Sequence, residues 1–278
     1  ATTEIYTLSL HDALPICMKE NNPDRVIYLA DARQSMHFIQ VFRCARKTGI
    51  VPDTTELVHI GFGTMNGKDG KPFKTRDGGV MRLEYLLKEI DDEMLNKIKE
   101  NQKEKENLNI DEAEAEQTAK TVALAAVKYG DLSNQASKDY IFDIDRFTSF
   151  EGNTGPYILY TIVRIKSILS KYEAKGGSVS ALKDAIMPAV NAGQKNLMLS
   201  LAKFNATIES AYEESAPHKI CAYIYELANA FNGFYHDTKI LSEENEELKK
   251  SYISLLVLTK EILEACIDML GFSAPDRM

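Results

Sequence analysis

The amino-acid sequence predicts two parts of different fold class: an α/β segment over residues 18–110 and an all-α helical bundle over residues 111–278. Two patterns predict this division, and the composition predicts that the chain is globular. A strand–helix–strand pattern occupies the first part, and a helical period of apolar residues runs nearly uninterrupted through the second. The balance of 44% hydrophobic and 27% charged residues is typical of a globular protein. No apolar run approaches the roughly 18 residues of a membrane-spanning helix.

Residues 1–17 differ in character from the rest of the chain. The stretch ATTEIYTLSLHDALPIC lacks the basic start and long apolar core of a signal peptide. It resembles the translated read-through of a sequencing adapter. We therefore expect this segment to be non-native and begin the fold at Met18.

The cysteines and histidines exclude two classes of stabilising site. The four cysteines include no Cys-x-x-Cys pair, and the five histidines show no metal-ligand spacing. The sequence thus predicts neither a disulfide framework nor a structural metal, and it is typical of a reducing cytoplasm.

The α/β segment begins with VIYLA, residues 26–30, an apolar run that predicts a buried strand ending at Asp31. A helix follows, with apolar residues at i, i+3, i+4 and i+7 and an end at Gly49. LVHIGFG, residues 57–63, predicts a second strand, parallel to the first. Two strands are too few for a stable doubly wound domain, so we expect further strands upstream.

The remaining elements are helical. A long helix is predicted from Val80, and residues 99–107 (KENQKEKEN) indicate a solvated helix end or linker because they have no apolar face. Asp111 with Glu114 resembles a capping box, and Gly130 is a stop signal. Further helices are predicted over residues 156–175, 189–214, 217–233 and from Ser242 to Gly271.

One loop combines flexible backbone with positive charge. GTMNGKDGKPFKTRDGG, residues 63–79, holds three lysines, one arginine and five glycines in a chain of formal net charge −8. Glycines let backbone amides approach phosphate oxygens and lysines neutralise their charge, so the loop is a candidate triphosphate clamp. It lacks the P-loop pattern. An ordinary exposed hairpin kept soluble by lysine is the simpler alternative.

The string HIGFGTMNGKDGKPFKTRDGG resembles the signature loop of bacterial arginyl-tRNA synthetases, which are class I enzymes. Upstream, VIYLADARQSMHFIQVF is similar to the strand and helix before that loop. Downstream, AAVKYGDLSN, DYIFDIDRFTSFEGNTGPYILY, PHKICAYIYELANAFNGFY and the terminal DRM resemble the family's anticodon-binding domain. The resemblance covers residues 18–278. It implies the C-terminal half of a Rossmann-type catalytic domain followed by an α-helical anticodon-binding domain.

The resemblance implies an adenine site in HIGFG. This string is not the His-Ile-Gly-His motif of class I synthetases, which lies far upstream of the mobile loop and is absent from this chain. It corresponds instead to a His-x-x-Phe-Gly element, so His59, Phe62 and Gly63 are implied to contact the adenine of ATP.

The resemblance also implies a reaction. Arginine attacks the α-phosphorus of ATP to give arginyl-adenylate and pyrophosphate, and the arginyl group then passes to tRNA. ATP comes with Mg²⁺. Cations aimed at the leaving pyrophosphate lower the barrier, and PFKTRDGG replaces the Lys-Met-Ser-Lys-Ser loop. Candidates for this role are Lys74, Thr75 and Arg76, supported by Lys68 and Lys71.

Asp31, Gln34 and His37 follow the first strand, at the usual ligand edge of an open parallel sheet. The resemblance implies that Gln34 lies near the substrate arginine, with Asp31 and His37 close by. A structural alternative is a capping box, in which Asp31 is the N-cap and Gln34 reaches back.

The helical half is acidic, since residues 111–278 contain 17 Lys and Arg against 24 Asp and Glu. Any contact with RNA must therefore be made by a local group of cations. Tyrosines and cations share one side of the helix over residues 156–175, as single-stranded RNA loops require. Packing of these tyrosines on a neighbouring helix is the alternative. The candidate tRNA contacts on the helix over residues 156–175 are Tyr157, Tyr160, Arg164 and Lys171. The resemblance implies three more: Asn153 in the FEGNTGPYILY motif, and Arg277 and Met278 at the chain end.

Three functions remain open: an arginine–tRNA ligase in its C-terminal part, a tRNA-binding module without catalysis, and a helical scaffold, which the ordered motifs disfavour. For the ligase we expect tRNA(Arg), L-arginine and ATP as partners, no membrane or DNA, a cytoplasmic monomer, and no structural metal.

The missing upstream motifs generate a first prediction. We expect no arginine activation by this polypeptide alone, because the His-Ile-Gly-His motif and the arginine-selecting residues are not in it. Arginine-dependent ATP–pyrophosphate exchange is the measurement, and exchange above the no-arginine background would contradict the expectation.

Overall fold

A computed structural model of the chain describes residues 10–71, 83–104, 111–180, 182 and 185–278, without the side chains of 10–13 and 101–104. The described chain forms two compact units. The first comprises residues 1–65 with the returning segment 136–140, and the second comprises residues 66–135 and 141–278. The division falls at residue 65, within a strand, whereas the sequence analysis places its boundary at residue 110. The long helix that precedes residue 110 packs in the second unit.

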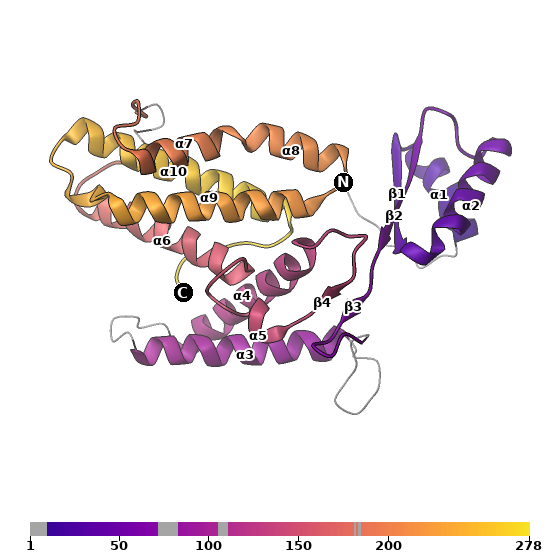
Figure 1. Cartoon of the computed structure of the whole chain (residues 1–278), viewed down its shortest axis with the longest axis horizontal. Helices are drawn as coiled ribbons and strands as arrows, with labels where there is room; N and C mark the ends of the chain where they lie inside the picture. The colour runs from indigo at the N-terminus through magenta and orange to yellow at the C-terminus, as the bar shows by residue number, and fades with distance from the viewer. Residues whose placement is uncertain (1–9, 72–82, 105–110, 181, 183–184) are drawn as a thin grey trace. The chain divides into compact units, whose positions relative to one another are not determined.

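The first unit contains the predicted strand–helix–strand pattern. β1 (Arg25–Asp31) and β2 (Glu56–Phe62) pair in parallel, joined by the 3₁₀ turn η1 (Ala32–Gln34) and helix α2 (Ser35–Lys47) (Figure 1). Gly49 adopts φ +69° just after α2, a backbone conformation that favours glycine. Both predicted strands and the predicted helix are therefore confirmed.

Helix α1 (Leu10–Asn21) covers one face of this short sheet. Leu14 is buried with Ala45 and Val51, and Val26 and Tyr28 pack against this cluster. The opposite face of β1 is open, since Ile27 and Leu29 are 48% and 67% exposed in the described chain. The strand was predicted to be buried, and within the described chain only one of its faces is covered.

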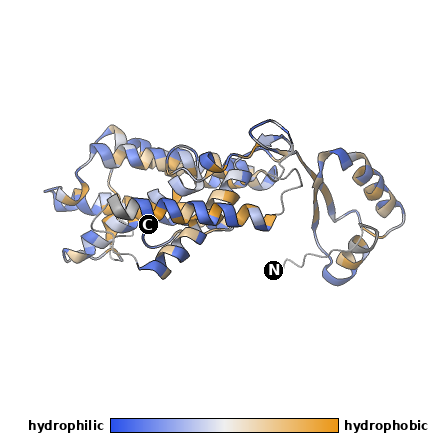
Figure 2. Ribbon diagram, turned by 90° about the horizontal axis from the view of Figure 1, so that it is seen from below, coloured by the Kyte–Doolittle hydropathy of each residue, from blue (hydrophilic) through white to orange (hydrophobic). Residues whose placement is uncertain are grey.

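The second unit is a helical bundle built on amphipathic helices. Helix α3 (Leu83–Glu104) packs on α4 (Glu112–Leu132), and α4 packs on α6 (Gly155–Ala174). Helices α7 (Ala192–Ala202), α8 (Phe204–Glu213) and α10 (Glu246–Met269) pack against α9 (Pro217–Asp237). Figure 2 shows hydrophobic and hydrophilic residues alternating around these helices, as expected for helices that bury one face. Short elements β3 (Met65–Asn66), β4 (Tyr140–Ile141), α5 (Ile144–Phe147) and η2 (Ile240–Ser242) complete the fold.

Several predicted helix boundaries were wrong. The helix predicted over residues 189–214 divides at Lys203 into α7 and α8, which lets both pack against α9. Helix α9 continues to Asp237, past Gly233. The last helix begins at Glu246 and not at Ser242, because Asn245 accepts a hydrogen bond from the Leu248 amide and caps it.

Gly130 is not the predicted stop, since α4 continues to Leu132. Its role is close packing: a Cβ there would lie 2.6 Å from the Phe147 ring. Gly155 makes a tighter approach, because a Cβ on it would lie 2.3 Å from the Ala125 carbonyl oxygen of α4. A backbone oxygen inside a helix cannot move aside, so Gly155 sets the contact between α4 and α6.

The two glycines Gly155 and Gly233 generate opposite stability predictions. Gly155→Ala should lower the free energy of unfolding of the bundle by about 1–3 kcal/mol through overpacking. Gly233→Ala should raise it by about 0.5–1 kcal/mol, because Gly233 has open space around its Cα and alanine is the better helix former. Urea unfolding followed by circular dichroism measures both. No loss of stability in Gly155→Ala would contradict this account of the α4–α6 contact, and a loss in Gly233→Ala would contradict the open space at Gly233.

Candidate functional site

The carboxyl ends of β1 and β2 bring two predicted site residues side by side. Asp31 ends β1 and pairs in register with Phe62 at the end of β2. The Asp31 carboxylate accepts a hydrogen bond from the Arg33 amide at 2.8 Å and so caps η1. Gln34 makes no side-chain cap bond. The alternative of a capping box is thus only half realised: Asp31 caps the turn, and Gln34 stays exposed.

The Arg33 side chain also holds the Asp31 carboxylate. Its Nε lies 2.9 Å from Oδ1, and its Nη2 lies 2.5 Å from Oδ2. These hydrogen bonds, which the Arg33 side chain donates, lower the pKa of Asp31 to about 2. Asp31 is therefore ionised at neutral pH, with a guanidinium group already on it.

Both predicted histidines contact the ring of Phe38. The His59 ring stacks on Phe38, with 4.3 Å between centroids and an interplanar angle of 9°. The His37 ring meets Phe38 edge-on at 5.9 Å. The His59 Nε2 atom is buried without a hydrogen-bond partner among the described residues, and buried polar atoms usually have one. A ligand would have to reach this buried atom to complete its hydrogen bond.

Gly63 is fixed by the returning segment 136–140. Its amide donates to the Ala136 carbonyl at 2.9 Å, and the next amide, of Thr64, donates to Asp139 Oδ1 at 2.6 Å. A Cβ on Gly63 would lie 2.5 Å from the Lys138 carbonyl. Only glycine permits this approach, so the position has a packing requirement besides its implied contact with adenine.

The basic loop begins with a tight turn in the second unit. The Gly67 amide donates to the Lys71 carbonyl at 2.8 Å, and Gly70 adopts φ +70°. Lys71 is exposed. The other predicted loop residues, Lys74, Thr75 and Arg76, lie outside the described residues.

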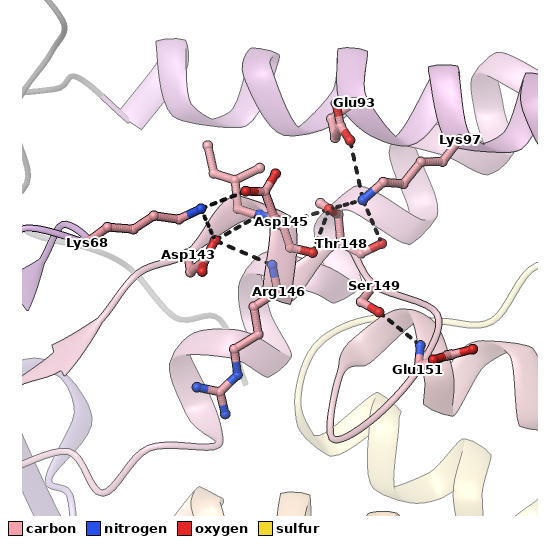
Figure 3. A network of polar contacts seen from close by, with 10 residues as sticks. Lys68, Glu93, Lys97, Asp143, Asp145, Arg146, Thr148, Ser149 and Glu151 are labelled. Carbon is pink, nitrogen blue, oxygen red and sulfur yellow. Dashed lines mark hydrogen bonds and ion pairs between the residues drawn. The ribbon is translucent and has the colours of Figure 1, made fainter.

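Lys68 is engaged by two carboxylates at the start of α5. Its Nζ lies 2.6 Å from Asp145 Oδ2 and 3.0 Å from Asp143 Oδ1 (Figure 3). The hydrogen bond from Lys68 lowers the pKa of Asp145, and the same contacts raise the pKa of Lys68. The Asp143 carboxylate also accepts from the Asp145 amide at 3.1 Å. Lys68 therefore anchors the first turn of the basic loop to α5.

A polar and aromatic network joins α6 to α9. The Tyr157 hydroxyl donates to Asn229 Oδ1 at 2.6 Å and accepts from Asn232 Nδ2 at 2.8 Å. Arg164 donates to Asn232 Oδ1 at 3.1 Å and to the Tyr160 hydroxyl at 2.9 Å. Its guanidinium lies 4.7 Å from the Tyr160 ring centroid. The alternative that the tyrosines meet a neighbouring helix is confirmed for Tyr157, while Tyr160 and Arg164 remain partly exposed.

A groove of about 810 Å³ opens beside this network. It gathers five of the seven candidate RNA contacts, which are Tyr160, Arg164, Lys171, Arg277 and Met278. Tyr235, on α9, also lines the groove and lies 5.5 Å from the Arg164 guanidinium. The other two candidates, Tyr157 and Asn153, are not among the residues that line the groove. Asn153 accepts a hydrogen bond from the buried Tyr129 hydroxyl at 2.6 Å.

The α9 side of this surface was not predicted from the sequence. Tyr225, Asn229, Asn232 and Tyr235 all belong to it, and Tyr225 meets the Tyr157 ring edge-on at 5.7 Å. The signal is present in YELANAFNGFY, where these residues recur every three or four positions and so share one helix face.

Comparison with protein families decides the family. Residues 3–144 match the model described as tRNA synthetases class I (R), catalytic domain, which is half of the chain. Residues 158–278 match the DALR anticodon binding domain. The chain belongs to the class I arginyl-tRNA synthetase family. The resemblance in the sequence and the predicted fold class, a catalytic-domain part followed by a helical anticodon-binding domain, are confirmed.

Curated relatives and solved structures are consistent with this family. An arginine–tRNA ligase of Agathobacter rectalis is 95% identical over 278 residues, and one of Alkaliphilus oremlandii is 54% identical over 261. The chain spans 46% and 43% of these two proteins, less than half of each. Arginyl-tRNA synthetases of Plasmodium falciparum and Thermus thermophilus superpose with TM-scores of 0.78 and 0.75 at 27% and 25% identity. They cover 96% and 92% of this chain, which covers 43% and 41% of theirs.

The status of residues 1–17 stays a prediction. The family match begins at residue 3 and the A. rectalis ligase aligns along the whole chain, while α1 buries Leu14. The boundaries predicted at residues 17 and 110 likewise stay predictions.

The carboxyl edge of the first unit generates a pH prediction. Arg33→Gln should raise the pKa of Asp31 from about 2 towards its ordinary value of 3.8. Because the folded-state pKa is the lower one, the stabilisation from this contact is complete above about pH 4 and is lost as the pH falls towards 2. NMR titration of the Asp31 carboxyl carbon measures the shift. Arg43→Gln, which removes a charge from α2, is the control, and an unchanged pKa in Arg33→Gln would refute the assignment.

Proposed function

We propose that this chain supplies the anticodon-side tRNA surface and part of the ATP and arginine site of an arginine–tRNA ligase. The tRNA part of the proposal depends on the groove beside α6 and α9. There, at least partly exposed tyrosine rings and an arginine with neutral partners meet, which suits an unpaired RNA loop. Tyr160 and Tyr235 offer rings for stacking bases.

Arg164 is the residue that supports the RNA proposal most directly. Its hydrogen-bond partners among the described residues are Asn232 and the Tyr160 hydroxyl, both uncharged. No carboxylate of the described residues pairs with it, so its positive charge is available to a phosphate. A cation held against tyrosine rings is also the geometry in which arginine stacks with bases.

The second part of the proposal is the ATP and arginine site, and its residues come from the first unit and the basic loop. We propose that His59, Phe62 and Gly63 contact the adenine of ATP, and that Gln34, with Asp31 and His37 nearby, contacts L-arginine. Lys74, Thr75 and Arg76, assisted by Lys68 and Lys71, would stabilise the charge that develops on pyrophosphate. The His59 Nε2 atom, which has no hydrogen-bond partner in the described part of the chain, and the exposed side chains of Gln34 and His37 are compatible with these roles.

The remaining partners belong to the same proposal. We propose tRNA(Arg), a cytoplasmic location and a monomer that binds neither DNA nor membranes. Among the described residues no helix has the length and hydropathy to cross a membrane. Mg²⁺ would arrive with ATP, because nucleotide-bound Mg²⁺ is held largely by substrate phosphates and water.

Substitutions in the groove test the RNA proposal. Tyr160→Ala should weaken binding of a tRNA(Arg) transcript by roughly 1–3 kcal/mol, about five- to 150-fold, through loss of a stacking face. Arg164→Gln should weaken it and reduce its salt dependence, because a cation is lost. Fluorescence anisotropy at several salt concentrations measures both.

Tyr212→Ala is the matched control, since Tyr212 is a 73% exposed tyrosine on α8, outside the residues that line the groove. It should bind tRNA as the unaltered chain does. Equal losses in Tyr160→Ala and Tyr212→Ala, or no measurable binding by the unaltered chain, would refute the groove as the tRNA surface.

A further inference from the structure

The C-terminal tail, residues 273–278, leaves α10 in a fixed direction. Gly271 adopts φ +81°, its amide donates to the Asp268 carbonyl at 2.9 Å, and the Phe272 amide donates to the Ile267 carbonyl at 3.1 Å. This pair of bonds is a Schellman motif, which terminates a helix at a glycine. Phe272 is only 5% exposed. The tail therefore starts from an anchored point.

A lysine of α6 holds the middle of the tail. Lys166 Nζ lies 3.1 Å from Asp276 Oδ1 and 3.3 Å from the Pro275 carbonyl oxygen. Lys166 stands two positions after Arg164, so the helix that lines the groove also fixes the tail beside it.

Arg277 is tied to the first turn of α4. Its Nε lies 3.0 Å from Glu114 Oε1 and its Nη2 lies 2.8 Å from Glu114 Oε2. Such a bidentate arginine–carboxylate pair fixes the orientation of the guanidinium as well as its distance from the carboxylate. The Glu114 amide meanwhile donates to Asp111 Oδ1, so Glu114 gives its backbone to the helix cap and its carboxylate to the tail.

The pairing changes the role expected of Arg277. A guanidinium compensated by a carboxylate is a poor phosphate ligand, unlike that of Arg164. The next residue, Met278, lines the same groove as Tyr160 and Arg164. We infer that Glu114 and Arg277 are positioning residues, a latch that holds Met278 against the groove so that it forms part of the wall met by the tRNA loop. This inference rests on the proposed tRNA-binding function.

Binding of a tRNA(Arg) transcript by the chain, measured across salt concentrations, separates a latch from a phosphate contact. If Arg277 acts through the latch, Glu114→Gln and Arg277→Gln should each weaken binding roughly three- to fivefold. The double variant should lose no more than either single one, because both changes break the same pair. The slope of log K against log salt should stay unchanged.

A phosphate contact predicts the reverse. Glu114→Gln would then free the guanidinium and strengthen binding, while Arg277→Gln would reduce the salt slope by about 0.7. Arg277→Lys distinguishes the latch from a phosphate contact, because lysine keeps the positive charge but cannot form the bidentate pair. The latch predicts a loss close to that of Arg277→Gln, and a phosphate contact predicts nearly unaltered binding.

Glu246→Gln is the matched control, since Glu246 also lies in the first turn of a helix and pairs with a lysine of its own helix, Lys249. It should leave tRNA binding unchanged and so corrects for the removal of one negative charge.

The methyl resonance of Met278 in the tRNA-free chain gives an independent readout. It should move towards its unfolded position in Glu114→Gln and Arg277→Gln, but not in Glu246→Gln. A displaced methyl with unaltered tRNA binding would overturn the inference. Absence of tRNA binding by the unaltered chain would overturn the proposed function, and the inference with it.

Discussion

The hydroxyl of Tyr157 is the contact on which the RNA-facing surface depends. It donates to Asn229 and accepts from Asn232, so one oxygen fixes two side chains of α9 to α6. Burial raises the pKa of Tyr157, which keeps the proton in place for the bond to Asn229. Asn232 then uses its own oxygen to hold Arg164. The orientation of the guanidinium in the groove therefore depends on the Tyr157 hydroxyl, about two turns away along α6.

The local charge on the surface of the bundle depends on which cations are paired with carboxylates, and not on the net charge of the region. The region over residues 111–278 is acidic, yet several of its cations are matched to carboxylates: Lys166 to Asp276, Lys219 to Glu214 and Arg277 to Glu114. Arg164 instead has amide and phenol partners. An amide dipole orients a cation without cancelling its charge, so a net negative domain can still present a positive site at one place.

The sequence could predict the elements whose signal is local. β1, α2 and β2 follow from apolar period and from Gly49, and α4 starts at Asp111, where the capping signal lies. It could not predict the break at Lys203, where neither glycine nor proline stands and packing on α9 decides. The candidate residues of α6 were found because they share one helix face. Their partners on α9 were missed because they lie about seventy residues away, and the Arg277–Glu114 pair joins residues 163 positions apart.

Three predicted ligand residues already hold an opposite charge from within the chain. Asp31 carries the Arg33 guanidinium, Lys68 carries Asp143 and Asp145, and Arg277 carries Glu114. Exposed ion pairs of this kind are weak and screened by salt, so a ligand with several contacts can replace one partner without unfolding its surroundings. The pairs differ in what replacement would do. Displacing Arg33 or the two aspartates frees a charge for a ligand, whereas displacing Glu114 would release the tail that carries Met278. The pairs of Asp31 and Lys68 can thus keep a binding group ordered before its ligand arrives. The pair of Arg277 with Glu114 instead shapes the binding surface itself.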